Sequence, residues 1–281
     1  MASNRDIEDK AVATALDDVQ KAHPDEFAAV LKDPQRKKEF EDAARDAARE
    51  VLKLSSGLRP DMAADEIEAY LEKALSKERV QQIKNGLNIP TYQIRLNKKD
   101  DGKTWADITR DGEEFMPSRA LVSLAAVKDV SWIQIASVII EAVMLVLSAV
   151  GIKLAVDEKV IQKTAQEIVP VVESSSALQK AVDALKEAFK NGSNYDKAKA
   201  IFYLIKDSYS AGILWKIIKS LCSNMSTWDW IKTAGIVSAM IIAALATDGV
   251  ALIAKIVLAL NSAYEFVKKV LNLSQLDEMS V

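Results

Sequence analysis

Hydrophobic residues recur at helical spacing through the first 89 positions, and punctuating residues divide this region into short amphipathic segments. Ser3 or Asn4 is suited to cap the first helix, and His23-Pro24 ends it. Most inward-facing positions carry alanine or other small residues, so we expect a thin, charged bundle over residues 1–89. The predicted helices lie at about 4–21, 34–54, 62–75 and 76–85.

The pattern changes after Pro90, where it predicts a small β-hairpin. TYQIRL is rich in strand-forming residues, NKKDDG has the composition of a turn, and KTWADIT alternates apolar with polar residues. Because a lone two-stranded hairpin is marginal in water, we expect it to pack against helices. A short helix near residues 118–128 is predicted to follow, which completes a connecting region over residues 90–130.

From Ser131 the chain becomes much more apolar. Segment 131–154 begins with Ser131 and Trp132 and holds one charged residue, Glu141, before Lys153. Its twelve Ile, Leu and Val residues favour transfer into a bilayer by about −5 kcal/mol in total, against about +3 kcal/mol for a central carboxylate. Insertion is therefore nearly balanced while Glu141 is ionised and becomes favourable when it is protonated.

The last apolar segment is symmetrical about a polar turn, Thr247-Asp248-Gly249. Residues 226–246 precede the turn and residues 250–270 follow it, and ~20 helical residues are enough to cross a bilayer core. The far ends of both arms carry aromatic and basic residues of the kind that anchors at lipid headgroups. The candidate membrane-insertion residues are Trp132, Glu141, Trp228, Trp230, Thr247, Asp248, Gly249, Lys255, Tyr264, Lys268 and Lys269.

Two readings of these apolar helices remain open. In the first, the helical hairpin and segment 131–154 enter a membrane, and the long stem of Lys255 lets its amine reach the headgroups. In the second, they form the centre of a large soluble fold, where helices that are apolar all round are common. Glu141 is then a buried acid paired with a lysine, and the tryptophans are packed near helix ends.

Both readings predict the same fold class: a mainly α multi-helix bundle with a buried hydrophobic helical hairpin and one small β-hairpin. The third region of this fold, a hydrophobic helical bundle, covers residues 131–281. Charge supports the division, since residues 1–130 carry 22 basic and 26 acidic residues and residues 131–281 carry 15 and 14. Neither part is strongly basic, so no nucleic-acid partner is expected.

Residues suited to catalysis or metal binding are scarce. His23 is the one histidine, and its His-Pro junction is typical of a loop. Cys222 is the one cysteine, so no disulfide can form within the chain, and we interpret it as a core thiol. HExxH and CxxC spacings, a glycine-rich phosphate loop and a nucleophile elbow are all missing from the sequence. We therefore expect neither an enzyme nor a cofactor.

The pattern from Trp228 to Val270, with its Thr247-Asp248-Gly249 tip, resembles that of α-helical pore-forming toxins. It is most similar to the colicin type, in which amphipathic helices sheathe a hydrophobic helical hairpin. The resemblance covers residues 131–273 at most, and the second apolar helix and the acidic N-terminal region depart from the family's pattern. It implies a soluble form, a trigger, and helices that rearrange on lipid.

The function expected from these patterns is that of a membrane-active helical protein, a pore-forming toxin or toxin-like effector. Its partners would be a lipid membrane and either further copies of itself in a homo-oligomer or a second protein component. The opening residues MASNRDIEDK lack the apolar stretch of a secretory signal. We therefore expect synthesis in the cytoplasm, then release or injection toward a target-cell membrane. The alternative is a non-catalytic interaction or structural protein that oligomerises through its apolar C-terminal helices.

Overall fold

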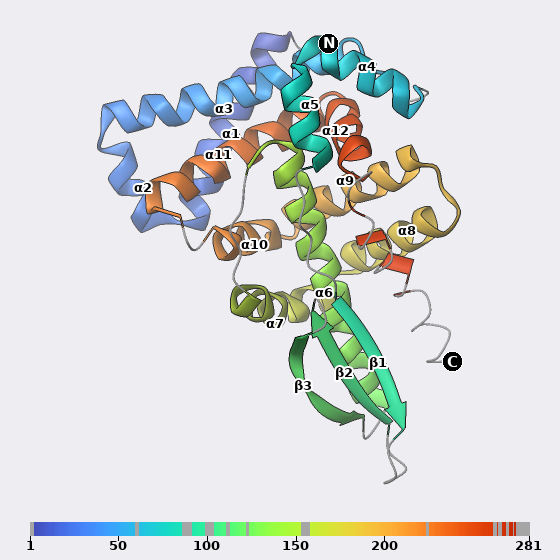
Figure 1. Ribbon diagram of the computed structural model, residues 1–281. Coiled ribbons are helices and arrows are strands. Elements are labelled where there is room, and N and C mark those ends of the chain that lie inside the picture. The colour runs from blue at the N-terminus through green and yellow to red at the C-terminus, as the bar shows by residue number, and fades with distance from the viewer. Residues whose placement is uncertain are drawn as a thin grey trace.

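The computed structural model describes residues 3–59, 62–85, 92–98, 104–110, 113–121, 124–152, 158–222 and 225–260, and single positions between 263 and 273. These residues are mainly α-helical, as the sequence predicted (Figure 1). The N-terminal helices are α1 (Asn4–Ala22), α2 (Pro24–Leu31), α3 (Pro34–Ser55), α4 (Ala64–Ala74) and α5 (Lys77–Asn85). The later helices are α6 (Leu124–Ala149), α7 (Glu158–Ser174), α8 (Ser176–Asn191), α9 (Asn194–Ser210), α10 (Ile213–Leu221), α11 (Thr227–Leu245) and α12 (Val250–Leu260).

Capping residues place the starts of the first helices. The Ser3 hydroxyl accepts the backbone N–H of Asp6, and the Asp6 carboxylate accepts the N–H of Ser3, which makes a capping box. Asp33 caps α3, with proline at its first position. The His23-Pro24 break is only a sharp turn between two helices, because Pro24 opens α2, a helix that the pattern did not predict.

Three strands lie between α5 and α6. β1 (Tyr92–Lys98) pairs antiparallel with β2 (Thr104–Arg110), and β2 pairs antiparallel with β3 (Glu113–Leu121). The short helix expected near residues 118–128 is right only for residues 124–128, which form the start of α6, because β3 continues to Leu121. The long apolar helix therefore starts seven residues before the position at which the apolar pattern begins.

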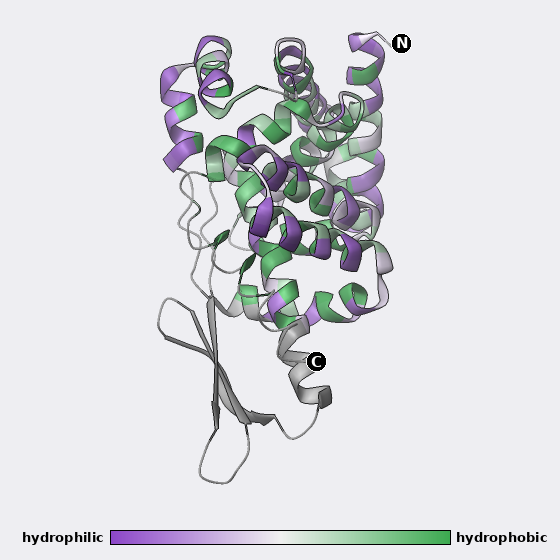
Figure 2. Ribbon diagram, turned by 90° about the vertical axis from the view of Figure 1, so that its right-hand side faces the viewer, coloured by the Kyte–Doolittle hydropathy of each residue, from purple (hydrophilic) through white to green (hydrophobic). Residues whose placement is uncertain are grey.

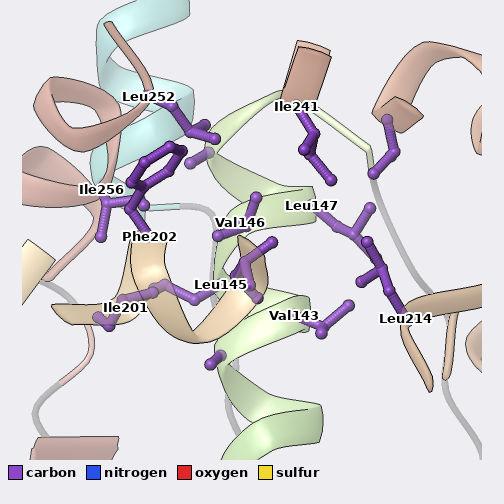
Figure 3. Packing of buried hydrophobic residues seen from close by; sticks show 14 of the residues in the cluster. Val143, Leu145, Val146, Leu147, Ile201, Phe202, Leu214, Ile241, Leu252 and Ile256 are labelled. Atoms are coloured by element: carbon purple, nitrogen blue, oxygen red, sulfur yellow. The ribbon is translucent and has the colours of Figure 1, made fainter. Parts of the chain in front are cut away.

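Helix α6 runs through the middle of the molecule, and other helices surround it (Figure 1). From Ile135 to Leu147 every residue of this helix is buried. Figure 3 shows its side chains meeting those of four other helices. The labelled residues are Val143, Leu145, Val146 and Leu147 of α6, Ile201 and Phe202 of α9, Leu214 of α10, Ile241 of α11, and Leu252 and Ile256 of α12.

The N-terminal helices cover α11 and so join the charged region of the chain to the apolar region. Helix α11 packs along α3 and α1, and α12 also touches α3, α4 and α5. Helices α11 and α3 approach closely at Gly235, where an added Cβ would lie 2.3 Å from a ring carbon of Phe40. The peripheral helices turn their hydrophobic residues inward and their hydrophilic residues outward (Figure 2). The density of charged residues falls near Ser131, but helices from before and after this point pack against each other.

Where the structure describes them, the two apolar arms are mostly buried, but α11 and α12 do not pack along each other as a hairpin. The turn between them places Asp248 and Gly249 at φ 52° and 74°. Helices α11 and α12 then touch at few points, because α11 lies on α1 and α3 while α12 lies on α9, α5 and α6. A helix that is apolar on most faces finds more surface to bury among several neighbours than against one.

Replacing Gly235 with alanine should lower the free energy of unfolding by about 1–3 kcal/mol, because the buried Phe40 ring has little room to shift. Denaturant unfolding measures the loss. In a Phe40→Leu background the same change should cost less than about 1 kcal/mol, since alanine favours the helix over glycine. An equal loss in both backgrounds would contradict the close approach of α11 to α3.

Candidate functional site

Among the described residues, two helical segments are long and apolar enough to cross a membrane, Trp132–Ala149 in α6 and Thr227–Leu245 in α11. Both are mostly buried in the fold, and a core helix of a soluble protein has the same length and composition. Helix α12 is apolar but has eleven residues, which is short of the ~20 needed for a crossing. Other helices shield both segments from solvent, and the contacts of those helices with α6, α11 and α12 define the candidate site.

The predicted membrane-insertion residues fall into different surroundings. Glu141 and Lys255 are each 1% exposed, and Trp230 is also buried. Trp132, Trp228 and Thr247 are half-buried, Asp248 is exposed and Gly249 is buried. Tyr264, Lys268 and Lys269 lie outside the described residues. The described members are therefore dispersed over α6, α11, α12 and the turn, and they do not converge on one pocket.

Trp230 contacts a residue that sequence reasoning had placed in a loop. The His23 ring is 9% exposed and meets the Trp230 ring edge-on, with 4.2 Å between centroids. The Lys219 ammonium lies 3.0 Å from His23 Nδ1 and 3.5 Å from a Glu26 carboxylate oxygen. Burial and the nearby Lys219 charge lower the pKa of His23, while Glu26 partly opposes them. The ends of α1, α2, α10 and α11 thus meet at one buried imidazole.

A second polar cluster ties the middle of α11 to α1. The Ser238 hydroxyl, fully buried in α11, donates to Asp18 Oδ2 at 2.5 Å. The Tyr209 hydroxyl of α9 donates to the same oxygen at 2.6 Å. Burial and the neighbouring Asp18 raise the pKa of Tyr209, so the phenol stays a donor. One carboxylate of α1 therefore satisfies polar groups from two helices of the core.

Two further ties join α3 to the turn and to α12. The Lys255 ammonium, deep in α12, pairs with the Glu50 carboxylate of α3, and 41% of that side chain is exposed. Burial lowers the pKa of Lys255, and the Glu50 charge opposes the shift. The Ser55 hydroxyl donates to Thr247 Oγ1 at 3.1 Å. Lys255 thus finds a partner on another helix rather than reaching solvent along its own stem.

These contacts define a unit that we name the clasp: helices α1 to α3, with His23, Asp18, Glu50 and Ser55 as its ties to the apolar helices. The clasp also holds itself together, because Arg45 of α3 lies 2.5 Å from Asp9 of α1. Sequence reasoning missed every tie on the clasp side. The one available signal was the presence of Ser238 and Lys255 inside apolar helices, since buried polar groups need partners. The sequence alone does not indicate which residues pair with Ser238 and Lys255.

These contacts are hydrogen bonds, an ion pair and an aromatic contact. No group of three or more His, Cys, Asp or Glu side chains in the described part of the chain is placed to hold a metal ion. Cys222 is buried, and burial raises the pKa of its thiol to about 12. The thiol therefore stays protonated at neutral pH, in agreement with a core role.

Removing the Glu50 partner should be far more damaging than removing Lys255. Glu50→Ala leaves a buried ammonium without its counter-charge and should lower the free energy of unfolding by about 3 kcal/mol. Lys255→Met keeps the length of the side chain without its charge and should cost less than about 1.5 kcal/mol. Denaturant titration measures both, and a larger loss in the methionine variant would show that the ammonium itself holds α12 in place.

Comparison with known proteins does not assign this arrangement to a family. No protein-family model, curated protein or solved structure matches the chain. A function must therefore be inferred from the two covered helices of membrane length and from the clasp that covers α11.

Proposed function

We propose that the protein is membrane-active, a pore-forming toxin or toxin-like effector that inserts its apolar helices into a target membrane. The observation that carries this proposal is that α11, a helix long enough to cross a bilayer, is covered by two amphipathic helices whose apolar faces meet it and whose charged faces point outward. Helices α1 and α3 supply that cover. A cover of amphipathic helices can be exchanged for lipid, which offers α11 an equally apolar surrounding.

The polar ties support the same proposal. Two polar groups of α11 and α12 that would be costly in lipid have a partner in the folded chain, Ser238 with Asp18 and Lys255 with Glu50. Water-soluble storage of a membrane helix requires such pairing, because an unpartnered buried polar group costs about 1–3 kcal/mol. Glu141, buried in α6, is then the group whose protonation makes insertion of α6 more favourable.

The alternative, a protein that assembles through its apolar C-terminal helices, finds less support. An assembly surface normally presents exposed apolar residues. Among the residues that the structure describes, the exposed large hydrophobic side chains are Tyr203, Leu245 and Leu271, and they lie on different elements. Helices α6 and α11 would have to leave the core before they could bind a second copy.

Release of a trapped dye from anionic liposomes, measured from neutral pH down to about pH 5, tests the proposal. We expect release that increases with acidity, together with flotation of the protein with the vesicles. An assembly protein would instead elute as a large species without lipid and would leave the vesicles intact. No release at any pH or lipid composition would overturn the proposal.

A charge in the centre of α11 should block release with little effect on the soluble fold. Ile236 lies at the midpoint of Thr227–Leu245 and is half-buried. Arginine there costs about 3 kcal/mol at the bilayer centre, so Ile236→Arg should reduce release about a hundredfold. Tyr203→Arg places the same charge at a site that is 43% exposed on α9 and should release dye as the parent chain does. Circular dichroism checks that both variants remain folded.

A further inference from the structure

The joint at His23 has the geometry of a contact that a single proton can break. His23 ends α1, where its N–H donates to the Val19 carbonyl at 2.9 Å. Its own carbonyl accepts the N–H of Phe27 in α2 at 3.0 Å. Its ring lies against Trp230 of α11. The residue therefore joins two helices of the clasp to the start of the helix that the clasp covers.

The partner of the ring fixes its protonation state. A lysine ammonium has donors only, so the 3.0 Å contact between Lys219 Nζ and His23 Nδ1 requires a lone pair on Nδ1. The imidazole is then neutral, with its proton on Nε2. In an imidazolium both nitrogens carry protons, so the hydrogen bond is lost and two cations face each other across the same short distance.

The charged groups around the ring offset that repulsion only in part. Lys219 of α10 and Glu26 of α2 are the charged groups that act on His23. Glu26 is the acid of the pair, and its carboxylate already lies 3.5 Å from the Lys219 ammonium. The third neighbour, Trp230, holds the same ammonium 5.7 Å from its ring centroid. Protonated His23 would therefore lie beside the Glu26 carboxylate, which already pairs with Lys219, and against the ring of Trp230.

We propose that His23 is an acid-operated latch: its protonation breaks the contact with Lys219, loosens the joint on Trp230 and frees α11 from the clasp. This inference rests on the proposed membrane function, for which it supplies the trigger.

The direction of the pH effect follows from proton linkage. Burial and Lys219 lower the pKa of His23 in the closed form below the ordinary 6.5, so the open form binds the proton more tightly. Above about pH 6.5 both forms are neutral at this residue and the latch has its full strength. As the pH falls below that value, the closed form loses stability, and the loss is complete below the lowered pKa. Mild acid therefore opens the latch.

His23 is the single histidine of the chain, which makes the test specific. Its imidazole C–H resonance, followed by NMR in the lipid-free full chain, should titrate below pH 6.5. Hydrogen exchange of α11 amides should accelerate severalfold, up to about tenfold, between neutral pH and about pH 5.5, after correction for the intrinsic rate. His23→Gln keeps an acceptor for Lys219 without the titration, and its α11 amides should change less than about twofold over that range.

Lys219→Met serves as the second variant and retains the histidine. Without the neighbouring charge the imidazole resonance should titrate at higher pH than in the parent chain, and the acid acceleration of exchange in α11 should shrink. If His23→Gln folds poorly, this variant decides the question alone. An unchanged imidazole titration in Lys219→Met, or equal acceleration in the parent chain and His23→Gln, would overturn the latch.

Liposome release by the same proteins separates the latch from the proposed function. Release by the parent chain that shifts to lower pH in His23→Gln supports both. Release with the same pH midpoint in both chains leaves the membrane function standing and overturns the latch. If neither chain releases dye at any pH while exchange in α11 still depends on His23, the membrane function is overturned and the proton-sensitive joint is retained.

Discussion

Helices α6, α11 and α12 carry apolar residues on nearly every face, so each needs protein on all sides before water is excluded. Burial of apolar surface contributes about 25 cal/mol per Å², and this term sets the arrangement of the other helices. Helix α6 takes the middle of the molecule. Helix α11 lies along α1 and α3, and the amphipathic helices form the outer layer that faces water (Figure 2).

Polar groups inside the apolar helices then select one arrangement among the many that burial alone permits. Ser238 lies within reach of Asp18, and Lys255 within reach of Glu50, in this packing of α11 and α12 against the clasp. A helix shifted by one turn would bury these groups without partners, at a cost of about 1–3 kcal/mol each. The ties therefore contribute more to the register of the core than to its total stability.

The burial of the apolar helices and the polar ties that hold their cover connect the fold to the proposed membrane activity. An apolar helix is satisfied equally by protein or by lipid, so what decides between them is the strength of the cover. That cover is carried by α1 and α3, which pack against each other and are joined by the Arg45–Asp9 ion pair. His23 lies where this unit meets the start of α11, and a change in its charge acts on the cover directly.

The sequence by itself determined the elements and their character. Helix caps at Ser3 and Asp33, the apolar runs and the turn at Thr247 to Gly249 were all readable, because caps and helical periodicity depend on residues at most a few positions apart. Mainly α structure and burial of both arms followed from these local signals. The same signals misplaced the start of α6, since strand pairing in β3 overrides a weak helical pattern between 118 and 128.

The tertiary structure alone decided which surfaces meet. Asp18 and Ser238 are 220 positions apart, and Glu50 and Lys255 are 205 apart. Nothing in either local segment selects its distant partner. The divergence of α11 from α12 has the same origin, because an apolar face is complementary to any other apolar face and only the sum of all contacts ranks the choices. The sequence and the structure differ most at His23. Its neighbours in sequence predicted a loop residue, but in the structure it is buried between the ends of α1, α2, α10 and α11.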